Sequence, residues 1–394
     1  MGTRYVLGLG GTVDYEIGWD PELLGSLAAR WGIRPDELDP GRSIDSERDL
    51  LCSLLGFLRS GSGGERFVAS SRILADFAAR FDRRITLGGT CVRAAMVLER
   101  FGLPALVHLV SIDDDVRRLL PAGTEYLCSA DRDSTDPHLI VQFPSGATVP
   151  VGGIEVVAAR ANRLIYVNDP PNRELVLDPA LGDELAAADV VLLSGFNVIQ
   201  DPAVLADRLG TLTADLDRLP PAGFVYFEDA GYHVPALTAA VRDALAPRVD
   251  VWAMNEDEWQ AWIGRPVDLL DAEDVAGALL ALRAVVPART LVLHTQHWAL
   301  AEGERAAELR AALRGGIVAA GTRYAHGDDF TAEQYRAIAD REPGPLGSGL
   351  AERLAGVAPA VVVEPAHQLD VPRPTTIGLG DTFVGGFLSA LARR

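Results

Sequence analysis

Short apolar runs alternate with longer segments of helical periodicity along most of the chain. The apolar runs predict strands at residues 4–9, 105–110, 188–193, 223–227, 249–254, 290–293 and 360–363. Amphipathic segments between them predict helices, among them residues 91–100, 201–216 and 235–246. Strands that are apolar throughout are typical of a parallel sheet covered on both faces. The pattern therefore predicts an α/β protein with a doubly wound, mostly parallel sheet.

The pattern changes between residues 131 and 177. There HLIVQF (138–143) and PSGATVPVGG (144–153) predict a hairpin, and RLIYV (163–167) predicts a further strand without a long helix in between. Such strands within a parallel-sheet chain predict a smaller β-rich lid domain. We expect the lid to comprise residues 14–48, 83–90 and 131–177, and the large domain residues 1–13, 49–82, 91–130 and 178–394. The PGPLGSG stretch at 343–349 predicts a surface loop.

The composition excludes several kinds of function. A net charge of -19 argues against nucleic acid or an anionic membrane as a partner. All 36 basic residues are arginines, which excludes mechanisms that need a P-loop lysine or a Schiff-base lysine. No apolar run approaches the roughly 18 residues of a membrane span. The three cysteines are far apart and fit free thiols, so we expect a cytoplasmic protein.

The strongest chemical signal is a glycine-bearing turn that leads into a helix near the C-terminus. Residues 375–382 read TTIGLGDT, and an apolar helical segment follows. Backbone N–H groups at such a helix start can hold the charge of a transferring phosphoryl group. The Asp381 carboxylate could accept a proton there from an attacking hydroxyl, or it could simply cap the helix.

Acidic side chains follow two predicted strands. Asn255 and Glu258 come after residues 249–254, and Glu228 follows residues 223–227. Carboxylates at the carboxyl edge of a parallel sheet can hold Mg²⁺, although an acidic helix start is also favoured by the helix dipole. Gly88 and Gly89 precede the helix at 91–100, where they allow either close approach to a polar ligand or an ordinary turn.

These segments together resemble the ADP-dependent glucokinase/phosphofructokinase family, a branch of the ribokinase-like sugar kinases. The matching segments are GTVDYE at 11–16, GGT at 88–90, ANRLIYV at 161–167, NEDE at 255–258, LHTQHWAL at 293–300 and GLGDT at 378–382. They occur in the family's order and span nearly the whole chain. The resemblance implies a ribokinase-like fold, Mg²⁺ as cofactor, ADP or ATP as phosphoryl donor, and a small sugar as acceptor.

The resemblance also assigns roles to individual residues. It implies that Asp381 is the catalytic base and that the backbone of Gly378, Leu379 and Gly380 forms the anion hole. Glu228 and Glu258 would organise Mg²⁺. The nucleotide site would be lined by Asn255, His294, Thr295, Val371 and Gly380, and the sugar site by Asp14, Glu65, Gly89, Thr90 and His138.

Two departures from the family pattern leave the substrate open. Tyr226 stands where the family has the histidine of a His-x-Glu motif, and Thr90 replaces an amide side chain. We expect Mg²⁺-dependent phosphoryl transfer from ADP to a hexose such as glucose, or to fructose 6-phosphate, by a monomer or small homo-oligomer. The alternative is a weakly active or inactive sugar- or nucleotide-binding member of the fold. The GLGG segment at 8–11 also suggests an NAD-dependent oxidoreductase. This interpretation is disfavoured, because Val13 stands where the dinucleotide-binding fingerprint needs its third glycine.

Overall fold

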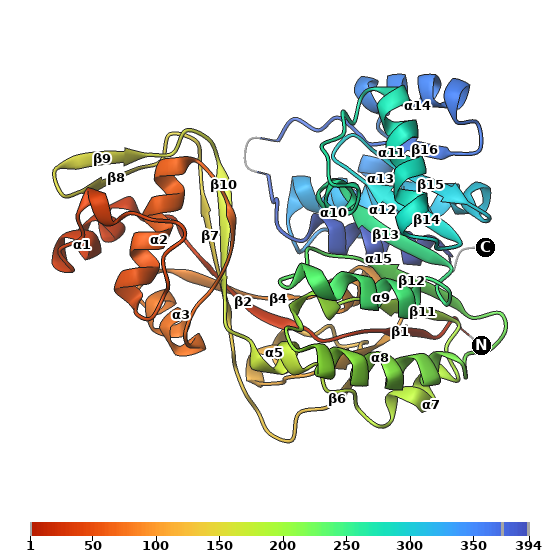
Figure 1. The fold of residues 1–394 in the computed structure, drawn as a ribbon, viewed down its shortest axis with the longest axis horizontal. Helices are drawn as coiled ribbons and strands as arrows, with labels where there is room; N and C mark the ends of the chain where they lie inside the picture. Colours follow the sequence, from red (N-terminus) through yellow and green to blue (C-terminus); the bar gives the residue numbers. More distant parts are fainter. Residues whose placement is uncertain (1, 372–373, 392–394) are drawn as a thin grey trace.

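The computed structural model describes residues 2–371 and 374–391, which form a large body and a smaller lid beside it (Figure 1). In the body, the described residues form a nine-stranded sheet in the order β16-β15-β14-β13-β12-β11-β1-β5-β6. The strands are β1 (Tyr5–Leu7), β5 (Ala105–Leu109), β6 (Glu125–Cys128), β11 (Val190–Leu193), β12 (Phe224–Glu228), β13 (Val251–Asn255), β14 (Thr290–His294), β15 (Trp298–Gly303) and β16 (Val362–Pro365). Pairing is parallel from β6 to β14, and β15 is antiparallel to both of its neighbours. The predicted doubly wound, mostly parallel sheet is confirmed.

Helices cover both faces of the large sheet. Successive strand residues point to opposite faces, and both sets are buried, so each face needs a covering layer. Tyr226 packs on one face with Phe387, whereas Phe227 packs on the other with Leu205. The first face is covered by α4 (Thr90–Arg100), α12 (Arg310–His326) and α15 (Leu379–Leu391), with α13 (Ala332–Ala339) against α12. The second is covered by α7 (Leu181–Leu185), α8 (Pro202–Leu216), α9 (Thr238–Leu245), α10 (Glu256–Ile263), α11 (Ala272–Val285) and α14 (Pro345–Val357). The described residues also form two short helices, α5 (Asp114–Leu119) and α6 (Pro170–Glu174). Four 3₁₀ turns lie at Pro35–Glu37, Phe196–Val198, Pro235–Leu237 and Ala306–Leu309.

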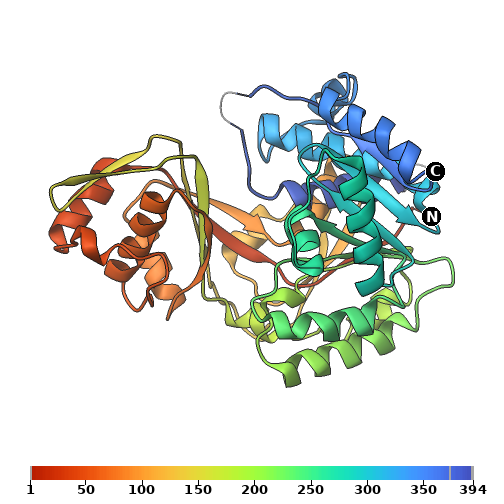
Figure 2. The ribbon, with the colours of Figure 1, turned by 45° about the horizontal axis from the view of Figure 1, so that its top comes forward.

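The lid contains a five-stranded sheet with helices on its outer side (Figures 1 and 2). Its strand order is β3 (Gly64–Phe67), β10 (Asn162–Val167), β7 (His138–Phe143), β2 (Thr12–Ile17) and β4 (Arg83–Gly88). The outer layer comprises α1 (Pro21–Arg30), α2 (Glu47–Ser60), α3 (Ser71–Ala78) and the hairpin of β8 (Thr148–Val151) and β9 (Ile154–Val157). The chain passes from the carboxyl end of β1 into β2 through residues 8–11, so the lid is joined to the body at the edge where the parallel strands end.

The two faces of the lid sheet differ in chemistry. Apolar side chains such as Tyr15, Leu139 and Tyr166 face the outer helices and are buried. Most of the alternate positions in β2 and β7 carry polar residues, which share one face because paired residues in register lie side by side. Asp14 pairs with His138, and Arg163 pairs with Gln142. This polar face of the lid is turned toward the body.

Three expectations about local structure differ from the observed fold. Residues 49–82 were expected in the large domain, but β3 pairs with β10 of the lid, and Tyr166 Oη of β10 donates to Ser53 Oγ of α2 (3.2 Å). The sequence of β3, GERF, is too polar and short to stand out as a strand. The hairpin is formed by β8 and β9 rather than by β7 and β8. Within 343–349, α14 already begins at Pro345, where proline favours the first helical turn.

Among the described residues, no helix is both long enough and apolar enough to cross a membrane.

Candidate active site

Asp381 lies in the first turn of α15, directly after the glycine turn. Gly378 has a φ of 66°, a left-handed conformation that glycine adopts without strain, and Leu379 begins the helix. Thr90 Oγ1 donates to Asp381 Oδ1 (2.8 Å), and Arg93 Nε lies 3.6 Å from Asp381 Oδ2. The carboxylate is therefore held from the side of α4, at the start of a helix whose backbone N–H groups can stabilise an anion.

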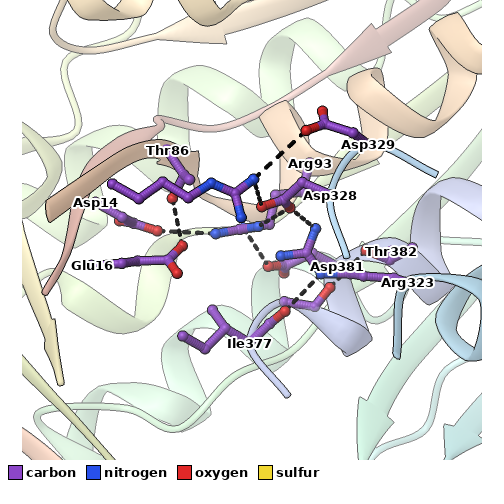
Figure 3. A network of polar contacts seen from close by, with 12 residues as sticks. Asp14, Glu16, Thr86, Arg93, Arg323, Asp328, Asp329, Ile377, Asp381 and Thr382 are labelled. Carbon is purple, nitrogen blue, oxygen red and sulfur yellow. Dashed lines mark hydrogen bonds and ion pairs between the residues drawn. The ribbon is translucent and has the colours of Figure 1, made fainter. Parts of the chain in front are cut away.

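A buried network of arginines and carboxylates surrounds this turn (Figure 3). Arg93 NH2 contacts Asp14 Oδ2 (3.1 Å), and Arg93 NH1 contacts Asp328 Oδ1 (3.4 Å). Arg323 also pairs with Asp328, and its Nε donates to the carbonyl of Ile377 (2.7 Å). Burial alone would raise the pKa of Asp328, but the charges of Arg323 and Arg93 lower it. The network thus keeps a buried carboxylate charged beside the glycine turn.

The predicted sugar-site residues Asp14, Glu65 and His138 lie on the polar face of the lid. Asp14 is 4% exposed, and its Oδ1 accepts a hydrogen bond from Thr12 Oγ1 (2.8 Å). His138 Nε2 lies 3.2 Å from Asp169 Oδ2. Burial alone would lower the pKa of His138, but the hydrogen bond and charge of Asp169 raise it. Glu65 Oε1 lies 2.9 Å from Nε2 of His233, which belongs to the body.

Gly89 allows the start of α4 to approach the β1–β2 connection. Its φ is 86°, and a Cβ atom at this position would lie 2.9 Å from the Cα of Gly11. The neighbouring Gly88 is equally constrained, because a Cβ there would lie 2.5 Å from Asp14 Oδ2. The double glycine therefore brings Asp14 and the first turn of α4, with Thr90, close together.

A second group of side chains lies at the carboxyl ends of β12, β13 and β14. His294 Nε2 is 2.8 Å from Glu228 Oε1, and Tyr226 Oη donates to Glu228 Oε2 (3.2 Å). Glu228 is thus contacted by an imidazole from β14 and by the phenol of Tyr226. His294 also stacks on Phe383 of α15, with ring centroids 4.6 Å apart, which links this group to the helix that carries Asp381.

The acidic character of this group fits a divalent cation. Burial, and next the charge of Glu228, raise the pKa of Glu258 to about 7. A cation between these carboxylates would relieve that repulsion, and Mg²⁺ needs few protein ligands because it retains waters and binds phosphate oxygens. The described residues contain no cluster of three or more histidine, cysteine or acidic side chains arranged as a metal site. Glu228 and Glu258 could therefore each offer a carboxylate oxygen to Mg²⁺, with its other ligands supplied by water or a bound anion.

The predicted nucleotide residues have different surroundings. Asn255 caps α10: its Oδ1 accepts from the backbone N–H groups of Asp257 (2.7 Å) and Glu258 (3.2 Å). Thr295 closes the turn between β14 and β15, with its Oγ1 donating to the carbonyl of Trp298 (3.0 Å). Val371 is partly buried in the irregular segment after β16. A Cβ atom on Gly380 would lie 3.4 Å from His294 Cε1, so Gly380 adjoins the β14 end.

Besides Arg93, two side chains that the sequence analysis did not single out contact the predicted sugar-site residues. Asp169 caps α6 and accepts from the backbone N–H of Asn172 (3.1 Å) while it faces His138. The Asp-Pro-Pro sequence at 169–171 predicts a helix start, but it does not predict the contact between Asp169 and His138. His233 lies in the connection after β12, and no local pattern points to its meeting with Glu65.

The fold and the site define a class of protein. The large, mostly parallel sheet and the smaller second sheet make up a ribokinase-like α/β fold, and the carboxylate at the glycine turn could accept a proton. Residues 3–271 match the family model described as the ADP-specific Phosphofructokinase/Glucokinase conserved region. The chain belongs to this family of ADP-dependent kinases, which transfer phosphoryl groups to sugar hydroxyls.

Solved structures share the fold of this chain. A hypothetical ADP-dependent phosphofructokinase from Pyrococcus horikoshii OT3 is 17% identical, with a TM-score of 0.80 over 100% of this chain and 98% of that chain. A phosphofructokinase from the same organism, solved with AMP, is 16% identical, with a TM-score of 0.81 and the same coverage. An ADP-dependent kinase in complex with fructose-6-phosphate and ADPbetaS is 17% identical, with a TM-score of 0.72 over 99% and 94%. Comparison with curated protein sequences gives no significant match.

Proposed function

We propose that this protein transfers the β-phosphoryl group of ADP to a hydroxyl group of a hexose such as glucose. The observation that carries the proposal is the position of Asp381. Its carboxylate contacts Thr90 and Arg93 of α4, and Arg93 in turn contacts Asp14 of the lid. On the other side, Phe383 of the same helix stacks on His294, the partner of Glu228. Asp381 thus lies between the proposed sugar side and the proposed metal side.

The proposed reaction balances as a direct transfer. A lone pair on the sugar oxygen forms a bond to the β-phosphorus of ADP, and the bond from that phosphorus to the α,β-bridging oxygen breaks, so AMP leaves. The hydroxyl proton passes to the carboxylate of Asp381. Backbone N–H groups of the turn at 378–380 stabilise the charge that develops on the transferred group. The lid excludes water, which would otherwise compete as acceptor.

Glu228 and Glu258 are the proposed metal-side carboxylates. Mg²⁺ bound there would neutralise charge on the phosphate oxygens of the nucleotide. His294 and Tyr226 hold the two oxygens of Glu228 in place, so the carboxylate is oriented by protein contacts on both sides.

For the acceptor, we propose that Asp14, Glu65 and His138 bind sugar hydroxyls, because carboxylates and imidazole on one sheet face suit a neutral polyol. A second candidate acceptor is fructose 6-phosphate. Arg163 favours it, since this cation shares the lid's polar face and its NH1 lies 3.5 Å from the carbonyl of Thr376, near the glycine turn. A guanidinium there suits a phosphate group.

The experiment is a comparison of donors and acceptors by AMP or ADP formation with Mg²⁺. ADP and ATP are each tested with glucose, fructose 6-phosphate and ribose, for the unchanged protein, Glu65→Gln and Arg163→Met. The proposal predicts turnover with ADP and glucose that Glu65→Gln weakens and Arg163→Met leaves intact. Turnover with fructose 6-phosphate that depends on Arg163 supports the second acceptor. Absence of transfer to every acceptor, with nucleotide still bound, contradicts the proposed activity and favours a binding protein.

A further inference from the structure

One turn of α4 holds both oxygens of the Asp381 carboxylate. Thr90 and Arg93 are three residues apart, so their side chains lie on the same side of the helix. Thr90 Oγ1 donates to Oδ1 at 2.8 Å, and Arg93 Nε faces Oδ2 at 3.6 Å. The orientation of the carboxylate is therefore set by a helix outside its own.

The same guanidinium reaches the lid. Arg93 NH2 lies 3.1 Å from Asp14 Oδ2, so one planar group spans the proposed base and a proposed sugar-binding carboxylate (Figure 3). A guanidinium presents its N–H donors in a rigid plane, unlike the single ammonium of lysine. The distance between the Asp14 and Asp381 carboxylates is thus set by the size of the Arg93 guanidinium, which contacts both.

Packing leaves Arg93 little freedom to move. The residue is 3% exposed, and its NH1 contacts a third carboxylate, Asp328, at 3.4 Å. A Cβ atom on Gly378 would lie only 2.8 Å from Arg93 Cδ and 2.9 Å from Arg93 Nε. The glycine turn that leads to the base therefore rests directly on the Arg93 side chain.

We infer that Arg93 is a positioning residue that fixes the Asp381 carboxylate relative to Asp14, so that a sugar held at Asp14 presents its reacting hydroxyl to the base. The inference rests on the proposed function. It assigns Arg93 no part in proton or phosphoryl transfer. Its effect is on geometry, and misplacement of about 1 Å at a reacting centre can cost about 100-fold in rate.

The test compares two arginine-to-lysine changes on the same helix of the full-length protein. Arg93→Lys keeps a positive charge but cannot reach three carboxylates from one plane. Arg100→Lys is the matched control, because Arg100 donates to the carbonyls of Asp328 and Phe330 without contacting Asp14 or Asp381. The measurements are thermal unfolding, the Kd for ADP, kcat and KM for the acceptor, and a crystal structure of Arg93→Lys.

We expect Arg93→Lys to fold, to bind ADP as the unchanged protein does, and to lose about 10- to 100-fold in kcat. We expect Arg100→Lys to retain kcat. In the crystal structure, the Asp381 carboxylate should be rotated or displaced from Thr90. Equal kcat losses in both variants, or an unchanged kcat in Arg93→Lys, would overturn the inference.

The crystal structure separates this inference from the proposed function. If the unchanged protein transfers no phosphoryl group to any acceptor, the proposed function fails, whereas the geometric claim still stands or falls on the Asp381 position. An unmoved Asp381 carboxylate in Arg93→Lys rejects the positioning role whatever the activity. Should Arg93→Lys fail to fold, Arg93→Gln, which keeps a planar donor group for Asp14 or Asp381, provides the same structural comparison.

Discussion

The surroundings of Asp381 distinguish it from an acidic residue that only caps a helix. A capping carboxylate accepts from backbone N–H groups of its own helix, as Asp271 does from Asp274 in α11 (2.9 Å). Asp381 lies inside the first turn, and its two oxygens face Thr90 and Arg93. Asp381 is therefore not an N-cap residue of α15, and its carboxylate is oriented by α4.

Asp381→Asn should fold normally and lose about 10²- to 10⁴-fold in kcat, because the amide cannot accept the hydroxyl proton. The measurements are kcat for ADP-dependent transfer and the melting temperature. Glu273→Gln, which removes an exposed carboxylate from the first turn of α11, serves as the control for the lost helix-dipole interaction. Retention of most activity by Asp381→Asn would mean that another group takes the proton.

Glu258→Gln should raise the Mg²⁺ concentration needed for half-maximal rate by about tenfold or more. The substitution keeps the side-chain length but removes one of the two charges that favour the cation. Asp257→Asn is the control, since Asp257 is an exposed carboxylate on the same turn of α10. A Mg²⁺ titration at saturating ADP and acceptor provides the comparison. The same shift in both variants would point to general surface charge and not to a metal-side carboxylate.

At the scale of elements, the central strands of the lid alternate between apolar and mostly polar side chains. Their apolar positions bury against α1, α2 and α3, and their polar positions face the body. Individual side chains of the body contact this face of the lid. Thr376 Oγ1 donates to Gln142 Oε1 (3.3 Å), and His233 pairs with Glu65. We therefore expect His233 to hold the carboxylate of Glu65, which lies on the edge strand β3.

His233→Ala should raise the KM for the hexose about tenfold with a smaller change in kcat, because a hydrogen bond to a charged group holds Glu65 in place. His233 also packs edge-on against Phe67, with ring centroids 4.6 Å apart. His233→Gln retains a donor and should recover part of the affinity. His367→Ala, which changes a histidine remote from Glu65, is the control. An unchanged KM in His233→Ala would show that Glu65 needs no partner from the body.

On the scale of the whole molecule, the sequence predicted the large sheet well and the lid less well. Body strands such as β11 and β12 are buried on both faces, so their apolar runs stand out. In the lid, β3 and β4 combine exposed charges with few apolar residues, and β3 was assigned to the wrong domain. The expectations for motif residues such as Asp381 rest on local sequence patterns. The Arg93 network and the pairing of His233 with Glu65 join residues far apart in the chain, which no local pattern reveals.

The contribution of His108 of β5 to folding stability should fall as the pH drops below about 6.5. This side chain is fully buried, and Nε2 accepts from the backbone N–H of Asp178 (2.9 Å). Burial lowers its pKa to about 4. The unfolded chain takes up a proton at this histidine near pH 6.5, whereas the folded chain does not, so folding loses about 3 kcal/mol between pH 6.5 and 4.

Urea unfolding of the unchanged protein and of His108→Gln, measured from pH 7.5 to pH 4.5, isolates this effect. The glutamine retains an acceptor but does not titrate, so the stability difference between the two proteins should change steadily below pH 6.5. A difference that is constant with pH would contradict the buried neutral state of His108.

The most direct test of the central claim is to follow the β-phosphorus of ADP by ³¹P NMR in the presence of Mg²⁺, glucose and the purified protein. The proposed function predicts that a sugar phosphomonoester and AMP appear in equal amounts, and that neither forms with Asp381→Asn on the same timescale. If the ADP signals persist with glucose and with fructose 6-phosphate, or if only inorganic phosphate is released, the protein is not the sugar kinase that its site indicates.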